Sequence, residues 1–151
     1  MPKSVRGTIN KTTVLSGTDL LPSVARLAGV TLPSEELLDG EDLSGTFFGK
    51  AQTRRSKPLF WNRPPDRPGP EASPWPELAM REGNWKFLMM RDGSNPQLFD
   101  LQNDLGEAHN LAAKNPEMVQ RLTRSLQSWW QGLPESQNSV KSSPGQKEAG
   151  H

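Results

Sequence analysis

Apolar and polar residues alternate through the middle of the chain, along a segment that runs from 80 to 90. This period-two pattern predicts an extended strand with one buried face. The residues on that face are Trp85, Phe87 and Met89. Residues 91–96, Arg-Asp-Gly-Ser-Asn-Pro, are types that favour turns, so the chain should reverse there. A second strand, 97–101, should then return with apolar residues on both faces and complete a hairpin.

A helical pattern spans residues 116–131, where apolar residues recur at three- and four-residue steps. These residues are Val119, Leu122, Leu126 and Trp129. Asn115 is expected to cap this helix, Pro116 to open it and Gly132 to end it. Packed across the hairpin, the helix should bury Trp129 or Trp130. The pattern therefore predicts an α+β fold: a small, mostly antiparallel sheet with a packed C-terminal helix.

The N-terminal third predicts a strand at 12–15 and a second amphipathic helix. Thr18 and Asp19 offer N-cap oxygens for this helix, and Gly29 should end it. Its apolar face consists of Leu21, Val24, Leu27 and Ala28. Farther along, residues 62–77 hold six prolines, a density that favours an extended surface loop. This loop is either a variable connector or a rim that faces a substrate.

Three segments near the hairpin carry a resemblance to a known family. Residues 83–86, 98–101 and 103–112 are similar to motifs near the end of type I (formylglycine-dependent) sulfatases, of the alkaline phosphatase-like superfamily. Those motifs read "glycine, x, tryptophan, lysine", "leucine, tyrosine, aspartate, leucine" and an acidic turn ending in "asparagine, leucine, alanine". Here Phe99 stands for the tyrosine, and Leu105 occupies a position where proline is common.

Upstream segments resemble the same family in the same order. Residues 19–30 are similar to its "aspartate, leucine, x, proline, threonine" helix that ends in "leucine, alanine, glycine, valine", with Ser23 for the threonine. Residues 39–50 resemble a following loop and short helix, with Asp42 for a serine, and 58–62 resemble the next strand. Several motifs in the family's order make the resemblance specific.

The resemblance implies that the fold is the C-terminal subdomain of an alkaline phosphatase-like α/β sulfatase. It divides the chain into a flexible arm (1–11), the end of the main sulfatase domain (12–57), the C-terminal subdomain (58–133) and a disordered tail (134–151). The apolar face of the N-terminal helix would then pack on a missing N-terminal catalytic domain. On this interpretation the chain is a fragment, a mis-started reading frame or a split product.

The amino-acid composition limits the classes of partner that the chain is expected to bind. Eighteen basic and 17 acidic residues give a net charge of +1, which provides no electrostatic footprint for nucleic acid or for an anionic membrane. The sequence also has no apolar run long enough for a membrane span and no signal-peptide core. It contains no cysteine, which excludes disulfides and a cysteine nucleophile. Localisation is not indicated by the residues; the resemblance implies a periplasmic or secreted protein.

Sulfatases of this type need a formylglycine made from Cys or Ser in a "Cys or Ser, x, Pro, x, Arg" motif, together with carboxylates that hold calcium. Neither is recognisable here, so we assign no catalytic residue and no metal ligand to this chain. We expect calcium and formylglycine in the full-length parent and no hydrolysis of sulfate esters by this chain alone. His109 is interpreted as a solvated or turn-capping imidazole rather than a catalytic base.

One binding hypothesis comes from the residues themselves. Trp61, Asn62 and Arg63, where a strand gives way to the proline-rich loop, could stack on a sugar or aryl ring and bind an anion. Packing of Trp61 in the fold is the alternative. The parent's substrate would be a sulfated carbohydrate or an aryl sulfate. Two other functions stay open: a phosphonate or phosphodiester hydrolase of the same superfamily, or an autonomous glycan-binding module.

Overall fold

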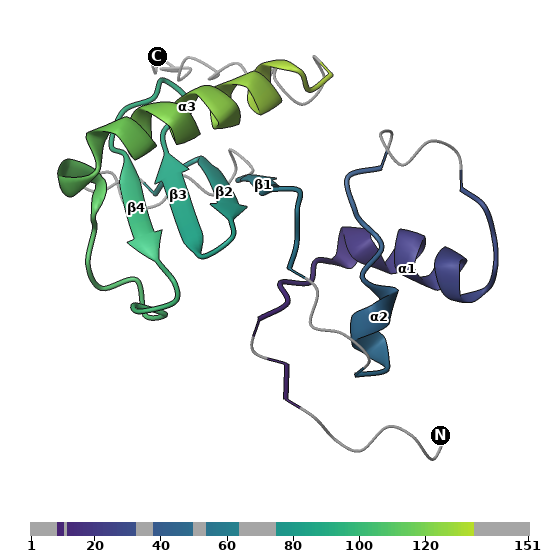
Figure 1. The fold of residues 1–151 in the computed structure, drawn as a ribbon. Coiled ribbons are helices and arrows are strands. Elements are labelled where there is room, and N and C mark those ends of the chain that lie inside the picture. The colour runs from purple at the N-terminus through teal and green to yellow at the C-terminus, as the bar shows by residue number, and fades with distance from the viewer. Residues whose placement is uncertain (1–8, 11, 33–37, 50–53, 64–74, 135–151) are drawn as a thin grey trace, which may run out of the picture.

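The computed structural model describes residues 9–10, 12–32, 38–49, 54–63 and 75–134. The strands form one four-stranded antiparallel sheet in the order β1-β2-β3-β4, and helix α3 lies across one face of that sheet (Figure 1). The predicted α+β fold is therefore confirmed. The elements are η1 (Gly17–Asp19), α1 (Leu20–Leu27), α2 (Ser44–Phe47), β1 (Leu59–Asn62), β2 (Leu78–Glu82), β3 (Trp85–Met89), β4 (Gln97–Asp100), η3 (Ala112–Lys114) and α3 (Pro116–Gln131).

The sheet contains one more turn than the sequence pattern predicted. The single strand expected over 80–90 is wrong, because the chain reverses at Gly83 and Asn84 and pairs Glu82 with Trp85. Gly83 has a φ of +58°, which a glycine at the first central position of a two-residue hairpin adopts without steric cost. The reversal predicted at 91–96 does occur, since β3 ends at Met89 and β4 begins at Gln97.

The core lies between the sheet and α3. Its fully buried residues are Leu78, Met80, Phe87, Met89 and Leu98 from the sheet and Leu122 and Leu126 from the helix. At the β1 edge, Phe60 stacks on Trp129 with ring centroids 5.1 Å apart. The faces predicted for Phe87, Met89 and the helix are thus confirmed. The opposite face also buries side chains, Leu59 and Phe99, as expected for a strand with apolar residues on both sides.

Two expected caps have other roles. Asn115 occupies the N-cap position of α3, but its side chain makes no capping hydrogen bond and its Nδ2 donates instead to the carbonyl oxygen of Leu111, at 3.0 Å. Asp19 likewise makes no side-chain cap for α1, because its carboxylate is buried in a network described below. Gly29, with a φ of +71°, follows the end of α1 as predicted.

Residues 12–15 do not form the predicted strand. A strand needs a neighbour for its backbone hydrogen bonds, and the only sheet in the described part of the chain is the one formed by β1 to β4. The predicted short helix near residue 47 does form, as α2. The predicted tail and most of the predicted arm and proline-rich loop lie outside the described residues.

Candidate functional site

Strand β1 carries the predicted substrate residues at its C-terminal end. Trp61 pairs with Ala79 of β2 and projects from the sheet face opposite α3, because Phe60 before it faces the helix. Its side chain is 46% exposed, so it is not a core residue of the described fold. Asn62 points toward the α3 side and accepts a hydrogen bond from Nη2 of Arg91, at 3.3 Å.

Arg63 contacts residues 75–77, on the other side of the proline-rich segment. Its amide donates to the carbonyl oxygen of Glu77 at 2.8 Å, which extends the β1–β2 pairing by one step. Its guanidinium donates to two further carbonyl oxygens, from Nε to Pro76 at 3.0 Å and from Nη2 to Trp75 at 2.5 Å. The Cζ atom also lies 5.9 Å from the centroid of the Trp75 ring, within range of a cation–π interaction. Arg63 therefore joins the two chain segments that flank residues 64–74.

Arg91 is a residue that the sequence did not single out. Its guanidinium forms an ion pair with Glu77 at 3.4 Å and lies 4.9 Å from the centroid of the Trp130 ring on α3. Nη2 also donates to the carbonyl oxygen of Arg63 at 3.4 Å. Arg91 thus ties β1, the start of β2 and α3 together. No sequence pattern could reveal this role, because its partners Arg63 and Asn62 lie 28 and 29 residues away.

Two guanidinium nitrogens in this region, Nη1 of Arg63 and Nε of Arg91, are buried and have no hydrogen-bond partner. A buried donor without a partner costs about 1–3 kcal/mol. Arg63 also makes no ion pair within the described residues, whereas Arg91 is balanced by Glu77.

Helix α1 presents a second surface of interest. Its buried side chains are Pro22, Ser23 and Ala25, while its large apolar residues face outward. These residues, which we call the α1 apolar face, are Leu20, Leu21, Val24 and Leu27, each 47–59% exposed. The predicted apolar face is therefore present and uncovered within the described part of the chain, in contrast to that of α3.

A buried carboxylate links the start of α1 to the segments around Glu41 and Arg55. Asp19 is fully buried and accepts hydrogen bonds from the Ser16 amide at 2.7 Å, the Glu41 amide at 3.0 Å and the Arg55 guanidinium. Burial raises the pKa of Asp19, but the hydrogen bonds and the positive charge of Arg55 outweigh it and hold the pKa below its usual value. Ser23 adds a buried bond, since its Oγ accepts from the Leu43 amide at 2.9 Å.

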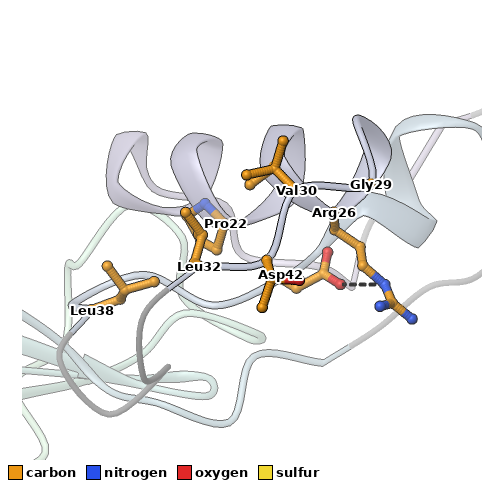
Figure 2. Close-up of a pocket in the computed structure, with 9 residues that line it drawn as sticks. Pro22, Arg26, Gly29, Val30, Leu32, Leu38 and Asp42 are labelled. Atoms are coloured by element: carbon orange, nitrogen blue, oxygen red, sulfur yellow. Dashed lines mark ion pairs between the residues drawn. The ribbon is translucent and has the colours of Figure 1, made fainter.

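A shallow hollow of about 210 Å³ lies beside the C-terminal half of α1. Figure 2 shows Pro22 and Leu38 on its apolar wall and the ion pair between Arg26 and Asp42, 3.8 Å apart, at its side. Arg26 is largely exposed, so this pair provides little binding energy. The hollow is lined by the side of α1 that carries Pro22 and Ala25, not by the α1 apolar face, and Arg26 and Asp42 are the charged residues of its described lining.

The described residues contain no candidate metal site, because no three or more of their His, Asp and Glu side chains are grouped so that they could hold an ion. His109 is 82% exposed, and its Nδ1 lies 3.4 Å from Asp104. The Asp104 carboxylate accepts hydrogen bonds from the amides of Ala108 and His109, which lower the pKa of Asp104 and hold the turn. No helix among the described residues is long and apolar enough to cross a membrane.

Comparison with known proteins finds sulfatases. A sulfatase of Formosa agariphila is 27% identical over 132 residues, which cover 80% of this chain and 24% of that protein. Arylsulfatase K of Mus musculus is 31% identical over 134 residues, with 85% of this chain and 23% of that protein covered. Arylsulfatase A of Homo sapiens is 32% identical over 132 residues, which cover 71% of this chain and 25% of that protein. No protein-family model matches the chain.

Solved structures agree in fold. A 2-O GAG sulfatase aligns with a TM-score of 0.55 at 23% identity and covers 82% of this chain and 26% of that chain. The structure of Ps i-CgsB in complex with k-i-k-neocarrahexaose aligns with a TM-score of 0.55 at 25% identity, with 74% and 23% covered. The chain thus spans about a quarter of the length of the proteins that it matches.

Proposed function

We propose, from the homology to sulfatases that runs over most of this chain, that it forms the C-terminal quarter of a sulfuric ester hydrolase and completes that enzyme's fold. In this proposal residues 12–57 end the main domain and 58–133 form the C-terminal subdomain. The larger remainder of the enzyme supplies the chemistry. The chain contributes a packing surface and a wall near the substrate.

The uncovered α1 apolar face is the observation that carries this proposal. Burying one large aliphatic side chain is worth about 1.5–3 kcal/mol, so four exposed ones on one short helix represent a substantial unused driving force. Proteins rarely leave such a contiguous face in water unless another surface covers it. The relatives are about four times longer than this chain, so they contain a partner of sufficient size.

The second part of the proposal is a substrate rim formed by Trp61, Asn62 and Arg63. Trp61 supports it most directly, because its exposed indole can stack on a sugar or aryl ring. Asn62 and Arg63 fix the geometry of the strand end through their bonds to Arg91 and to the Trp75 and Pro76 carbonyls. A sulfated carbohydrate or an aryl sulfate is the substrate class.

Calcium has no ligand set among the residues that the structure describes, and formylglycine has no precursor in the sequence, because no Cys or Ser stands in a "Cys or Ser, x, Pro, x, Arg" motif. The sequence contains no cysteine, and the described residues form no cluster of metal ligands. When present, such groups supply a nucleophile for the sulfur atom and a divalent charge for the sulfate oxygens. We place them in the remainder of the enzyme and assign no step of the reaction to them here.

A chimera tests the proposal. The region of the Formosa agariphila sulfatase that aligns with this chain would be replaced by it, and hydrolysis of p-nitrophenyl sulfate would be measured. The chimera should be active, whereas the 151-residue chain alone should not hydrolyse the ester. A double variant of the α1 apolar face, Leu21→Glu with Leu27→Glu, should abolish activity. Leu105→Glu, at an isolated position that is 81% exposed, is the matched control and should leave activity unchanged.

Two results would contradict the proposal: a cooperatively folded chimera without sulfatase activity, or full activity in the Leu21→Glu, Leu27→Glu variant. If the chimera does not fold, binding of a hydrophobic dye to the 151-residue chain provides a second measurement. The chain should bind the dye, the double variant should bind much less, and Leu105→Glu should bind as the unmodified chain does. Equal dye binding by all three proteins would count against a docking role for α1.

A further inference from the structure

We propose that Arg91 is a positioning residue, which holds the C-terminal end of β1, and with it the exposed indole of Trp61, in the orientation that the substrate rim requires. The inference rests on the proposed function, because it concerns the same rim. It adds a residue that lies outside the rim predicted from the sequence, and it connects that rim to helix α3. Arg91 acts through contacts within the protein, so we assign it no contact with the substrate.

The reach of the Arg91 side chain is the first step. Arg91 follows the end of β3, and β2 lies between β3 and β1 in the sheet. Neighbouring strands are about 4.8 Å apart, so β1 lies about 10 Å from the strand that precedes Arg91. Its Nη2 nevertheless donates to Oδ1 of Asn62 at 3.3 Å and to the carbonyl oxygen of Arg63 at 3.4 Å. One long side chain therefore binds the two residues that directly follow Trp61.

The need of β1 for such support is the second step. β1 is an edge strand of the described sheet, four residues long, and its only neighbour in that sheet is β2. The last bond between them runs from the Arg63 amide to the carbonyl oxygen of Glu77. Glu77 also binds Arg91, because its Oε2 accepts the Arg91 amide at 3.0 Å and its Oε1 lies 3.4 Å from Nη1. Arg91 and Glu77 therefore hold the same end of β1 together.

The surroundings of the guanidinium are the third step. Its Cζ lies 4.9 Å from the centroid of the Trp130 ring on α3, a cation–π contact. Nη1 pairs with Glu77, Nη2 donates to the end of β1, and Nε is buried without a hydrogen-bond partner. The side chain is only 22% exposed. Its effect on a ligand must therefore pass through the residues that it holds, and Trp61 is the exposed aromatic residue among β1 and its neighbours at this end.

An ion pair at the opposite end of β2 provides a matched control. Arg121 of α3 donates to both carboxylate oxygens of Glu82, the last residue of β2, whereas Glu77 directly precedes that strand. Each pair joins an arginine to a glutamate at one end of β2, but of the two arginines only Arg91 also binds the end of β1. General stabilisation of the sheet is the competing explanation, and it predicts similar effects for both arginines.

Hydrogen exchange in the 151-residue chain measures the positioning directly. Arg91→Ala should raise the exchange rate of the Arg63 amide about tenfold, as loss of one or two hydrogen bonds at a strand end does. Arg121→Ala should leave that rate unchanged. Arg91→Lys retains a cation for Glu77 but lacks the forked nitrogens that reach β1, so it should fold and give an intermediate rate. An unchanged rate in Arg91→Ala, or an equal rise in Arg121→Ala, would overturn the proposal.

A double-mutant cycle in the active chimera tests the effect on the rim. Arg91→Ala and Trp61→Ala should each raise the KM for p-nitrophenyl sulfate about threefold to tenfold and change kcat by less than about twofold. Because Arg91 acts through Trp61, the double variant should have the KM of Trp61→Ala alone. An unchanged KM in Arg91→Ala, or single effects that multiply in the double variant, would contradict a positioning role.

Failure of the proposed function gives a different result from failure of this inference. An unsubstituted chimera that folds but does not hydrolyse p-nitrophenyl sulfate contradicts the proposed function, and the exchange rate of the Arg63 amide then still decides whether Arg91 positions the end of β1. An active chimera whose KM is the same with Arg91→Ala and with Arg121→Ala contradicts only the role of Arg91.

Discussion

The sheet with α3 and the segment around α1 have similar apolar patterns but opposite outcomes. In the first region Phe87, Leu98 and Leu126 are completely buried. In the second, Leu21 and Val24 are more than half exposed although their spacing is equally helical. The difference teaches that periodicity identifies which residues share a face, while the rest of the chain decides whether anything covers that face. The first region carries its own core, whereas the apolar face of the second is uncovered within the described residues.

The largest test of this contrast compares truncation of a core residue with truncation on the α1 apolar face. Phe87→Ala should lower the free energy of unfolding by about 3–5 kcal/mol, because it leaves a cavity between the sheet and α3. Val24→Ala should change it by less than about 0.5 kcal/mol in the isolated chain. Urea denaturation followed by tryptophan fluorescence measures both. Equal losses would show that α1 already packs on a surface in solution.

The Asp19 network should be the strongest interaction within the weaker region. Asp19→Asn removes a buried charge that binds Arg55 and leaves Glu41, 3.7 Å from that guanidinium, as its remaining carboxylate in the described residues. The cost should therefore lie toward the lower end of the range of about 3–5 kcal/mol that is typical of a broken buried pair. Hydrogen exchange should rise at the Glu41 amide and through α1 and remain unchanged in β2 and β3. Asp42→Asn, in the exposed pair with Arg26, is the control and should have little effect. Exchange that rises equally in the sheet would argue against two separable regions.

The same carboxylate predicts a pH dependence. Because the pKa of Asp19 is lower in the folded chain than in the unfolded one, its contribution is complete above the unfolded value of about 3.9 and is lost as pH falls through the folded value. Protection of the α1 region should therefore decrease below about pH 4 in the unmodified chain. The Asp19→Asn variant, which has no proton to take up at this site, should show a smaller decrease. Parallel profiles would assign the acid sensitivity to other carboxylates.

The close approach of Gly40 to the Thr18 backbone predicts a substitution with an intermediate effect on stability. A methyl group on Gly40 would lie 2.0 Å from the carbonyl oxygen of Thr18, so Gly40→Ala must displace backbone. The expected cost is about 1–3 kcal/mol, as for other overpacked sites. Gly17→Ala is a matched control, because an added Cβ meets no atom within 4 Å there. Similar stability of the two variants, measured by thermal unfolding of the α1 region, would mean that this contact is loose in solution.

Local signals in the sequence predicted much of this fold. The apolar spacing of α3, the end of α1 at Gly29 and the turn before β4 were all predicted correctly, because each depends on neighbouring residues. What could not be predicted depends on distant contacts. Asp19 was expected to cap a helix, but its partner Arg55 lies 36 residues away. The segment 12–15 has strand propensity, but it pairs with no strand among the residues that the structure describes.

The candidate site shows the same division. The sequence identified Trp61 from its place at a strand end, and the structure shows an exposed indole there. It did not identify Trp75 or Arg91, because they meet Arg63 only once the β1–β2 pairing has formed. Residues flanking a proline-rich loop therefore need the register of the sheet before their roles can be assigned.

The smallest test concerns the turn that the pattern missed, within the region that has its own core. Gly83 has a φ of +58°, and a Cβ added to it would meet no atom within 4 Å, so Gly83→Ala adds conformational strain without a clash. An L-residue at positive φ costs about 1–2 kcal/mol, and asparagine costs less because it tolerates this conformation. Thermal unfolding should therefore rank the unmodified chain above Gly83→Asn and Gly83→Ala below both. If alanine is tolerated fully, the hairpin must form with a different turn in solution, and a longer strand through 80–90 becomes tenable again.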